Sequence, residues 1–363
     1  METLEERITH LETENQKLFE ELKRKKASIS VMVKELKVKN DQLLERSRDL
    51  SDSVNYAKRI QLAIMPPRYV VNKMIADSFI MYLPKDVVSG DFYFVEKVGS
   101  KVVLAVVDCT GHGVPGALMS VVGFNCLDQA VAKDGMTKPA DILSFLDEGV
   151  NATLRQTADE SGVKDGMDLG LCCFDHDTNL LQYAGAYNPA YIISGEEKLV
   201  ITREREIDAL HPRVVGTKAE METVPELEPA PVSSNGDKPA WLGGSEEITY
   251  EPSLSMDGKH LFEIKADKLP IGVNLDGVVD IYTNHTVKLE KGDAVYLFSD
   301  GYADQFGGEA LKKFKYHRLR ELLLSMQDKT MIEQKRILVR TFSHWKGEED
   351  QIDDVLIMGL RVD

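Results

Sequence analysis

The chain has 363 residues, of which 43% are apolar, so it is long enough for one large domain with an appendage or for two domains. Its formal net charge of −16 argues against a nucleic-acid partner, because phosphate backbones are bound by clustered Lys and Arg. No apolar run reaches the roughly 18 residues of a membrane span, and no apolar segment follows the first methionine, so we expect no membrane insertion and a cytoplasmic location.

The first fifty residues carry a heptad repeat in which ten of fourteen core positions are apolar and no Pro or Gly intervenes. Those apolar positions are Leu4, Ile8, Leu11, Leu18, Leu22, Ile29, Met32, Leu36, Leu43 and Leu50. The pattern predicts a coiled coil over residues 1–54. Asn15 falls at an a position, where one polar residue favours a parallel dimer in a fixed register, so we expect a homodimer. A lone helix packed on the domain is the alternative, but fifty residues would reach about 75 Å, too long for one small domain.

The heptad phase continues through Ile60 and Ile64 and stops at the Pro66–Pro67 pair. Residues 55–67 are therefore predicted to form a linker helix that joins the stalk to the next domain. Buried contacts at Ile60 and Ile64 would let this helix act as a switch, because a rigid helix transmits a change in register to whatever its last turns touch. A passive helix that caps the core is the alternative.

Acidic residues stand where apolar strand patterns meet turns. Residues 102–107 form a β-branched apolar run, typical of a strand buried on both faces, which ends on Asp108 before a glycine-rich turn. Asp91 precedes another strand pattern, Asp300 follows one, and Asp353 precedes the last. A buried carboxylate costs desolvation free energy unless it is paired, hydrogen-bonded or bound to a cation.

The remaining segments predict further helices, strands and one loop. Residues 138–158 are expected to be an amphipathic helix, and helices are also expected near 312–327 and 331–342. Between them lie two expected strands, GMDLGLCCFD and NLLQYAGAYNPAYIIS. Residues 213–259, dense in Pro, Ser, Gly and Glu, are predicted to be a mobile loop insertion.

The four cysteines lie in or beside apolar runs and lack zinc-site spacing, so small core residues in a reducing compartment are expected instead of disulfides. They are Cys109, Cys126, Cys172 and Cys173. The last two are adjacent on an expected strand, so their side chains should point to opposite faces.

If the four strand–turn junctions converge, their aspartates form an oxygen-rich pocket for hard divalent cations such as Mg²⁺ or Mn²⁺. Two such ions about 3.5–4 Å apart can activate a water and bind a phosphoryl group. No Ser–His–Asp order, cysteine-nucleophile context or His-rich zinc spacing competes with this interpretation. Metal-assisted hydrolysis is therefore the predicted chemistry.

The series of motifs resembles that of the PPM-type serine phosphatases, most of all their bacterial branch of stage II sporulation protein E and the stress-response phosphatases. The motifs are GD at 90–91, VVDCTGHGVPGALMS at 106–120, AGAYNP at 184–189, FSDG at 298–301 and QIDD at 351–354. The resemblance covers about residues 55–363. It implies an α+β fold, an αββα sandwich of two antiparallel β-sheets flanked by helices, over residues 68–363.

The resemblance also implies a site with two Mn²⁺ or Mg²⁺ ions. Asp108 would bridge both ions, and the backbone carbonyl of Cys109 would be a further ligand. Asp91 would serve one ion, and Asp300 and Asp353 the other. The implied activity is hydrolysis of phosphoserine or phosphothreonine on a signalling protein, such as an anti-sigma factor antagonist.

Some residues depart from the family pattern. Phe94 stands where the family often has a second acid, Tyr187 replaces a common Asn, and Val355 replaces the usual Thr or Ser. The missing acid leaves open a second function, a catalytically degenerate phosphatase fold that serves as a dimeric signalling scaffold. His112 is a candidate general acid for the leaving serine oxygen, since eukaryotic relatives use a histidine near this turn; a structural role is the alternative.

Two nucleotide-binding interpretations of the same turn are weaker. GHGVPG fits GxGxxG, but a polar stretch and a helix follow it instead of the second parallel strand that a dinucleotide site needs. DCTG fits the DxxG of GTPases, yet GxxxxGK[ST] occurs nowhere in the chain. Neither explains the other three acidic turns.

Overall fold

The computed structural model describes residues 3–154, 165–205, 244–272 and 281–362. The chain divides into two compact units, Met1–Ala57 and Lys58–Asp363. The second unit holds every sheet and all the residues predicted to form the site.

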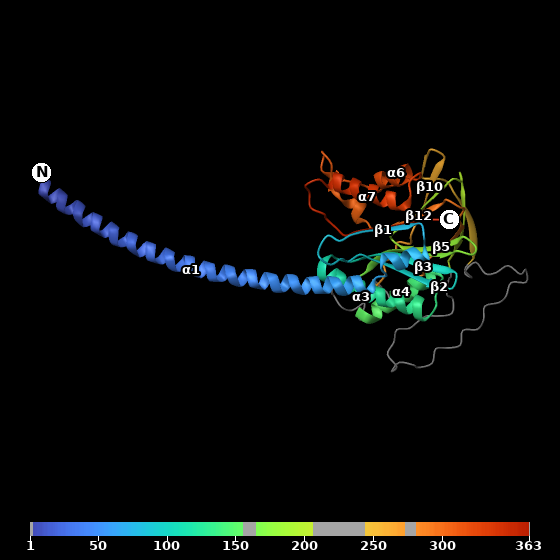
Figure 1. The fold of residues 1–363 in the computed structure, drawn as a ribbon, viewed down its shortest axis with the longest axis horizontal. Helices are drawn as coiled ribbons and strands as arrows, with labels where there is room; N and C mark the ends of the chain where they lie inside the picture. Colours follow the sequence, from blue (N-terminus) through green and yellow to red (C-terminus); the bar gives the residue numbers. More distant parts are fainter. Residues whose placement is uncertain (1–2, 155–164, 206–243, 273–280, 363) are drawn as a thin grey trace, which may run out of the picture. The chain divides into compact units, whose positions relative to one another are not determined.

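Helix α1 runs without a break from Leu4 to Ile64 (Figure 1). In the single chain its apolar heptad positions are exposed, from 49% at Ile8 to 80% at Leu4. Long helices in proteins are stabilised by burial of an apolar face, which one chain does not provide here. The coiled coil therefore stays a prediction. Among the described residues, none of the helices has the length and apolar character needed to cross a membrane.

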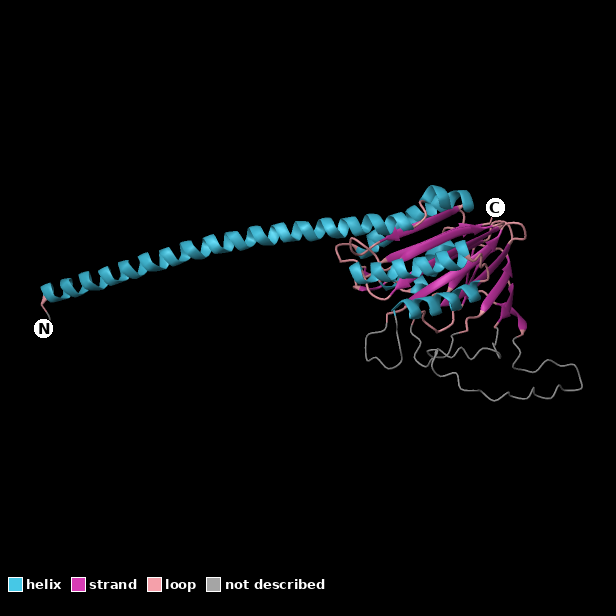
Figure 2. Cartoon of the chain, turned by 90° about the horizontal axis from the view of Figure 1, so that it is seen from below, coloured by secondary structure: helices cyan, strands magenta, loops and turns pink. Residues whose placement is uncertain are grey.

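Two antiparallel sheets lie face to face between two layers of helices (Figures 1 and 2). The seven-stranded sheet has the order β2 (Phe92–Val98), β3 (Lys101–Cys109), β4 (Met167–Asp175), β5 (Leu180–Ala186), β11 (Asn284–Lys288), β7 (Leu199–Glu204), β8 (Ser245–Tyr250). The six-stranded sheet has the order β1 (Ser78–Leu83), β15 (Val355–Arg361), β12 (Ala294–Phe298), β6 (Ala190–Ser194), β10 (Lys259–Ile264), β9 (Leu254–Met256). The expected αββα sandwich is confirmed.

Helices cover the outer face of each sheet. Green helices α3 (Gly113–Asp128) and α4 (Pro139–Leu154), with the π-helical turn η1 (Gln129–Lys133), pack on the seven-stranded sheet (Figure 1). Red helices α6 (Tyr316–Ser325) and α7 (Met331–Lys346) cover the six-stranded sheet. The short helices are α2 (Arg68–Met74) and α5 (Gly301–Asp304), and a small ribbon pairs β13 (Phe306–Gly307) with β14 (Lys312–Lys313).

The core has three layers of apolar side chains, one between the sheets and one under each helix layer. Cys172 lies in the layer between the sheets, whereas the adjacent Cys173 faces the α3–α4 layer. All four cysteines are free. The predicted opposite orientation of the pair is therefore confirmed.

One expected strand is two strands in the structure. The segment NLLQYAGAYNPAYIIS forms β5 in one sheet and β6 in the other. The break falls at Tyr187, whose φ of +58° is in the left-handed region that interrupts a strand. The hydroxyl of Tyr183 donates to the carbonyl of Asn188 at 2.7 Å and stabilises the connection between β5 and β6. The two halves of the segment pair with strands of different sheets, and the apolar pattern of the sequence does not show this.

The expected loop insertion at 213–259 also contains strands. Residues 245–250 and 254–256 form β8 and β9, at the edges of the two sheets. Residues 206–243 lie outside the described residues. Most side chains of these two edge strands are at least partly exposed, so the strands contain few apolar residues. A composition poor in apolar residues therefore indicated a loop.

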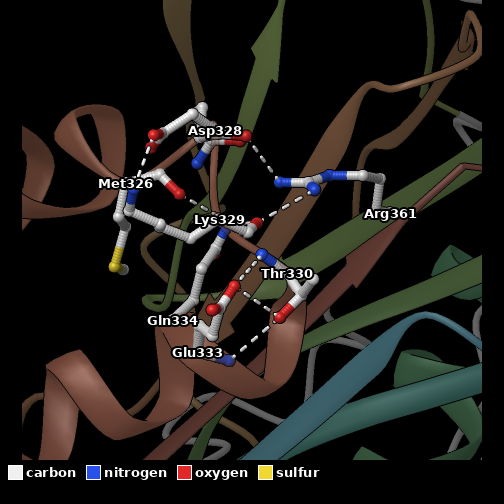
Figure 3. Close-up of polar contacts among 8 residues, drawn as sticks. Met326, Asp328, Lys329, Thr330, Glu333, Gln334 and Arg361 are labelled. Atoms are coloured by element: carbon white, nitrogen blue, oxygen red, sulfur yellow. Dashed lines mark hydrogen bonds and ion pairs between the residues drawn. The ribbon is translucent and has the colours of Figure 1, made fainter.

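Hydrogen bonds fix the turn between α6 and α7 against β15 (Figure 3). Thr330 caps α7 in a capping box with Glu333. The Arg361 guanidinium donates to the carbonyls of Lys329 at 3.1 Å and Gln327 at 3.0 Å. The helix layer is therefore anchored to the strand that begins two residues after Asp353.

Candidate active site

Strand β3 ends at the acidic junction that the sequence predicted. Its residues 102–107 are fully buried, and Asp108 follows them at the strand end. The chain then turns through Gly111 and Gly113, whose φ angles of +84° and +68° are readily adopted only by glycine, into α3.

Glycines also let two backbone segments meet beside this junction. A Cβ atom on Gly90 would overlap the carbonyl oxygen of Gly111, and one on Gly116 would overlap the same oxygen. The GD motif and the glycine-rich turn therefore approach each other closely. This contact brings Asp91 beside Asp108.

A pocket of about 220 Å³ opens at these strand ends. Its walls are Asp108, Cys109, Thr110, Gly111, His112, Gly166, Met167, Asp168, Pro270, Asp300 and Asp353. The structure thus brings together five of the six predicted site residues. The sixth, Asp91, is not on the wall but lies buried, with 2% of its surface exposed. Its carboxylate accepts a 2.6 Å hydrogen bond from the hydroxyl of Ser299.

The clustered carboxylates raise one another's pKa. Burial, and then the neighbouring Asp108, hold the pKa of Asp91 well above its usual value. Burial and the charges of Asp300 and Asp353 do the same for the pKa of Asp108. Burial and Asp353 raise the pKa of Asp300 to about 6. The site therefore favours any cation that offsets this repulsion.

The pocket wall also contains one acid that was not predicted from the sequence, Asp168. It lies directly opposite Asp108 in the β3–β4 register, and burial together with Asp300 raises its pKa to about 6. The signal was present, because Asp168 stands near the start of an apolar strand, as Asp91 and Asp353 do.

Asp354 connects the last acidic junction to the GD loop, the segment between β1 and β2 that contains Gly90 and Asp91. Its buried carboxylate accepts hydrogen bonds from the backbone N–H of Lys85 at 2.7 Å and of Gly90 at 2.8 Å. Asp304, in contrast, forms an ion pair with Lys313 at 2.8 Å. Asp354 thus positions the loop that leads into Asp91, and Asp304 is a surface group.

The carboxylate oxygens of this pocket are the kind of donor that hard divalent cations prefer. Within the described residues, no Lys, Arg or His forms an ion pair with Asp91, Asp108, Asp300 or Asp353. Nor do three His, Cys, Asp or Glu side chains converge into a complete metal cage in the part of the chain that the structure describes. Mg²⁺ commonly binds one or two carboxylates and keeps several waters, so an open arrangement suits it.

Phe94, at the position of the missing family acid, is a core residue. It is buried and meets Phe124 with ring centroids 5.5 Å apart. A carboxylate is therefore replaced by aromatic packing between β2 and α3.

The end of α1 contacts the GD loop through a residue that the sequence interpretation overlooked. The predicted burial of Ile60 is wrong, since 50% of it is exposed. Gln61 is buried instead, and its Nε2 donates to the carbonyl of Ser89 at 2.6 Å and to the hydroxyl of Ser120 at 2.9 Å. Its Oε1 accepts from the Ser89 N–H at 3.2 Å. Ile64 is partly buried against the core layer under α3.

Solved structures resemble this chain to different degrees. The SiaA-PP2C domain of Pseudomonas aeruginosa is 28% identical to the chain, with a TM-score of 0.63, and the match covers 87% of this chain and 98% of that one. A structure of the PP2C phosphatase domain with a fragment of the regulatory domain of SpoIIE from Bacillus subtilis is 14% identical, with a TM-score of 0.49, over 79% of this chain and 63% of that one. No curated protein matches the chain.

The sequence also matches the family described as stage II sporulation protein E (SpoIIE) over residues 99–226 and 251–363. These two ranges contain Asp108, Asp300 and Asp353, three of the acids that meet in the pocket. The chain therefore belongs to the SpoIIE family and has the fold of its PPM-type phosphatase domains.

Proposed function

We propose that this protein is a metal-dependent phosphatase that hydrolyses phosphoserine or phosphothreonine on a signalling protein of the anti-sigma factor antagonist type. The observation that carries the proposal is the convergence of Asp108, Asp300 and Asp353 on one pocket without a basic partner among the described residues. Membership of the SpoIIE family supports the reaction class. The substrate class rests on the family resemblance of the motifs.

Each acid has a proposed role toward two Mn²⁺ or Mg²⁺ ions. Asp108 would hold both ions, with the backbone carbonyl of Cys109 as a further ligand. Asp91 would hold one ion, and Asp300 with Asp353 the other. When bound, the ions would supply the positive charge that draws in the phosphoryl group and lowers the pKa of a water. Ser299 keeps Asp91 in place through its 2.6 Å hydrogen bond.

The test is hydrolysis of p-nitrophenyl phosphate by the full-length chain. We expect turnover with Mn²⁺ or Mg²⁺, none in excess EDTA, and recovery when the ion is restored. An undiminished rate in EDTA would contradict metal dependence. No turnover under any metal condition would favour the alternative, a phosphatase fold that serves as a signalling scaffold.

A further inference from the structure

An acidic residue outside the proposed metal set lies against His112 at the rim of the pocket. Asp86 is in the loop between β1 and β2, and its Oδ2 lies 2.6 Å from Nδ1 of His112. His112 belongs to the same pocket wall as Asp108 and Asp300. The Asp86–His112 pair therefore links the β1–β2 loop to the pocket in which a phosphoryl group would bind.

The backbone around His112 accommodates this contact. His112 stands between Gly111 and Gly113, whose positive φ angles set the direction of the chain on both sides. A Cβ atom on Gly113 would stand 3.2 Å from Oδ2 of Asp86, closer than such contacts usually are. Glycine at 113 thus leaves room for the carboxylate beside the ring.

The contact has more influence on orientation than on stability. The side chains of His112 and Asp86 are 50% and 46% exposed, and ion pairs at such exposure contribute little to folding. A carboxylate that accepts from Nδ1–H fixes the orientation of the ring. Nε2 is then the nitrogen free to act in the pocket, and it carries a proton when the ring is in its imidazolium form.

We propose that Asp86 is a positioning residue that orients His112 so that Nε2–H protonates the leaving oxygen of the phosphorylated side chain. The proposal rests on the proposed phosphatase function. In this step a water oxygen forms a bond to phosphorus and loses a proton to the solvent, and the bond between phosphorus and the serine oxygen breaks. The serine oxygen takes the proton from Nε2, inorganic phosphate is released, and the neutral imidazole regains a proton from water.

The test compares two leaving groups in the full-length enzyme with saturating Mn²⁺. p-Nitrophenolate leaves without a proton, whereas the more basic phenolate of phenyl phosphate benefits from one. We expect Asp86→Asn to lower kcat for phenyl phosphate about tenfold and kcat for p-nitrophenyl phosphate less than about threefold. His112→Gln should give the same split with a larger loss. The double variant should match His112→Gln alone, because Asp86 acts through His112.

A matched control separates this effect from loss of a surface ion pair. Lys198 and Glu251 form another exposed pair at 2.7 Å, and Glu251→Gln should change neither rate. The Mn²⁺ concentration for half-maximal activity should be unchanged in Asp86→Asn. An active wild type whose Asp86→Asn variant loses both rates equally, or whose double variant loses more than His112→Gln, would overturn this proposal alone. A wild type inactive on both esters would overturn the proposed function, and this proposal with it.

Discussion

Single uncharged groups hold the acidic residues of the site in place. The Ser299 hydroxyl donates to Asp91 and accepts from the N–H of Leu356 at 2.9 Å, so one side chain links two strands to a proposed ligand. Asp354 fixes the segment before Asp91, because its carboxylate accepts hydrogen bonds from the backbone N–H groups of Lys85 and Gly90. Hydrogen bonds of this kind fix a carboxylate without neutralising it. The charge therefore stays available to a cation.

His285 gives the fold a specific dependence on pH. It is buried, its Nδ1 has no hydrogen-bond partner among the described residues, and burial together with Arg203 lowers its pKa to about 4. Between that pKa and the ordinary value near 6.5 the unfolded chain binds more protons than the folded one, so stability falls as pH decreases. We expect His285 to lower the free energy of unfolding by about 2 kcal/mol at pH 5 relative to neutral pH.

Urea unfolding at pH 5 and pH 7.5 measures this dependence. The variant His285→Gln cannot titrate in this range, so it should lose about 2 kcal/mol less than the wild type between the two pH values. Equal pH dependence in the two proteins would show that His285 is not the responsible group.

At the level of elements, the end of α1 and the GD loop form one hydrogen-bonded unit. Gln61 satisfies both backbone groups of Ser89, two residues before Asp91. Removal of the amide leaves buried polar groups without partners, which costs about 1–3 kcal/mol. The linker helix is therefore proposed to act on the site through Gln61 rather than through Ile60.

Gln61→Ala tests this coupling. We expect the Mn²⁺ concentration for half-maximal phosphatase activity to rise about tenfold, since a destabilisation of about 1.4 kcal/mol at the GD loop corresponds to that factor. Ile60→Ala is the matched control on the same helix and should leave metal affinity unchanged, because Gln61, not Ile60, forms the hydrogen bonds to Ser89. If Gln61→Ala lowers only thermal stability, with metal affinity and activity per folded molecule intact, α1 is a passive cap.

At the level of the whole molecule, the proposed dimer explains the exposed heptad positions of α1. A second copy would bury them, and Asn15 would set a parallel register. Light scattering should give a dimer for the full chain at micromolar concentration. The same chain with Leu18 and Leu22 replaced by Lys should be monomeric, since charges at these core positions disfavour the seam. A monomeric wild type would contradict the coiled coil.

The extent to which the sequence predicted the molecule follows from the range of each interaction. Asp108 and Asp300 were found because a buried strand and its turn are local patterns. The Asp86–His112 contact joins residues 26 positions apart, and no local pattern indicates it. The burial of Gln61 was not predicted, because a heptad pattern indicates only which apolar residues are buried. The partner of its amide, Ser89, lies 28 residues away in the sequence. The β5–β6 crossing was missed because strand patterns do not show which sheet a strand joins.

The central claim, that the acidic strand ends hold metal ions for phosphate-ester hydrolysis, is tested most directly at Asp108. Asp108→Asn removes the charge of the residue that would bridge both ions and leaves the size of the side chain nearly unchanged. We expect no measurable turnover of p-nitrophenyl phosphate in saturating Mn²⁺. The circular dichroism spectrum should match that of the wild type and the melting temperature without metal should be no lower, because the substitution relieves repulsion among buried carboxylates. A folded Asp108→Asn variant with wild-type activity would contradict the account.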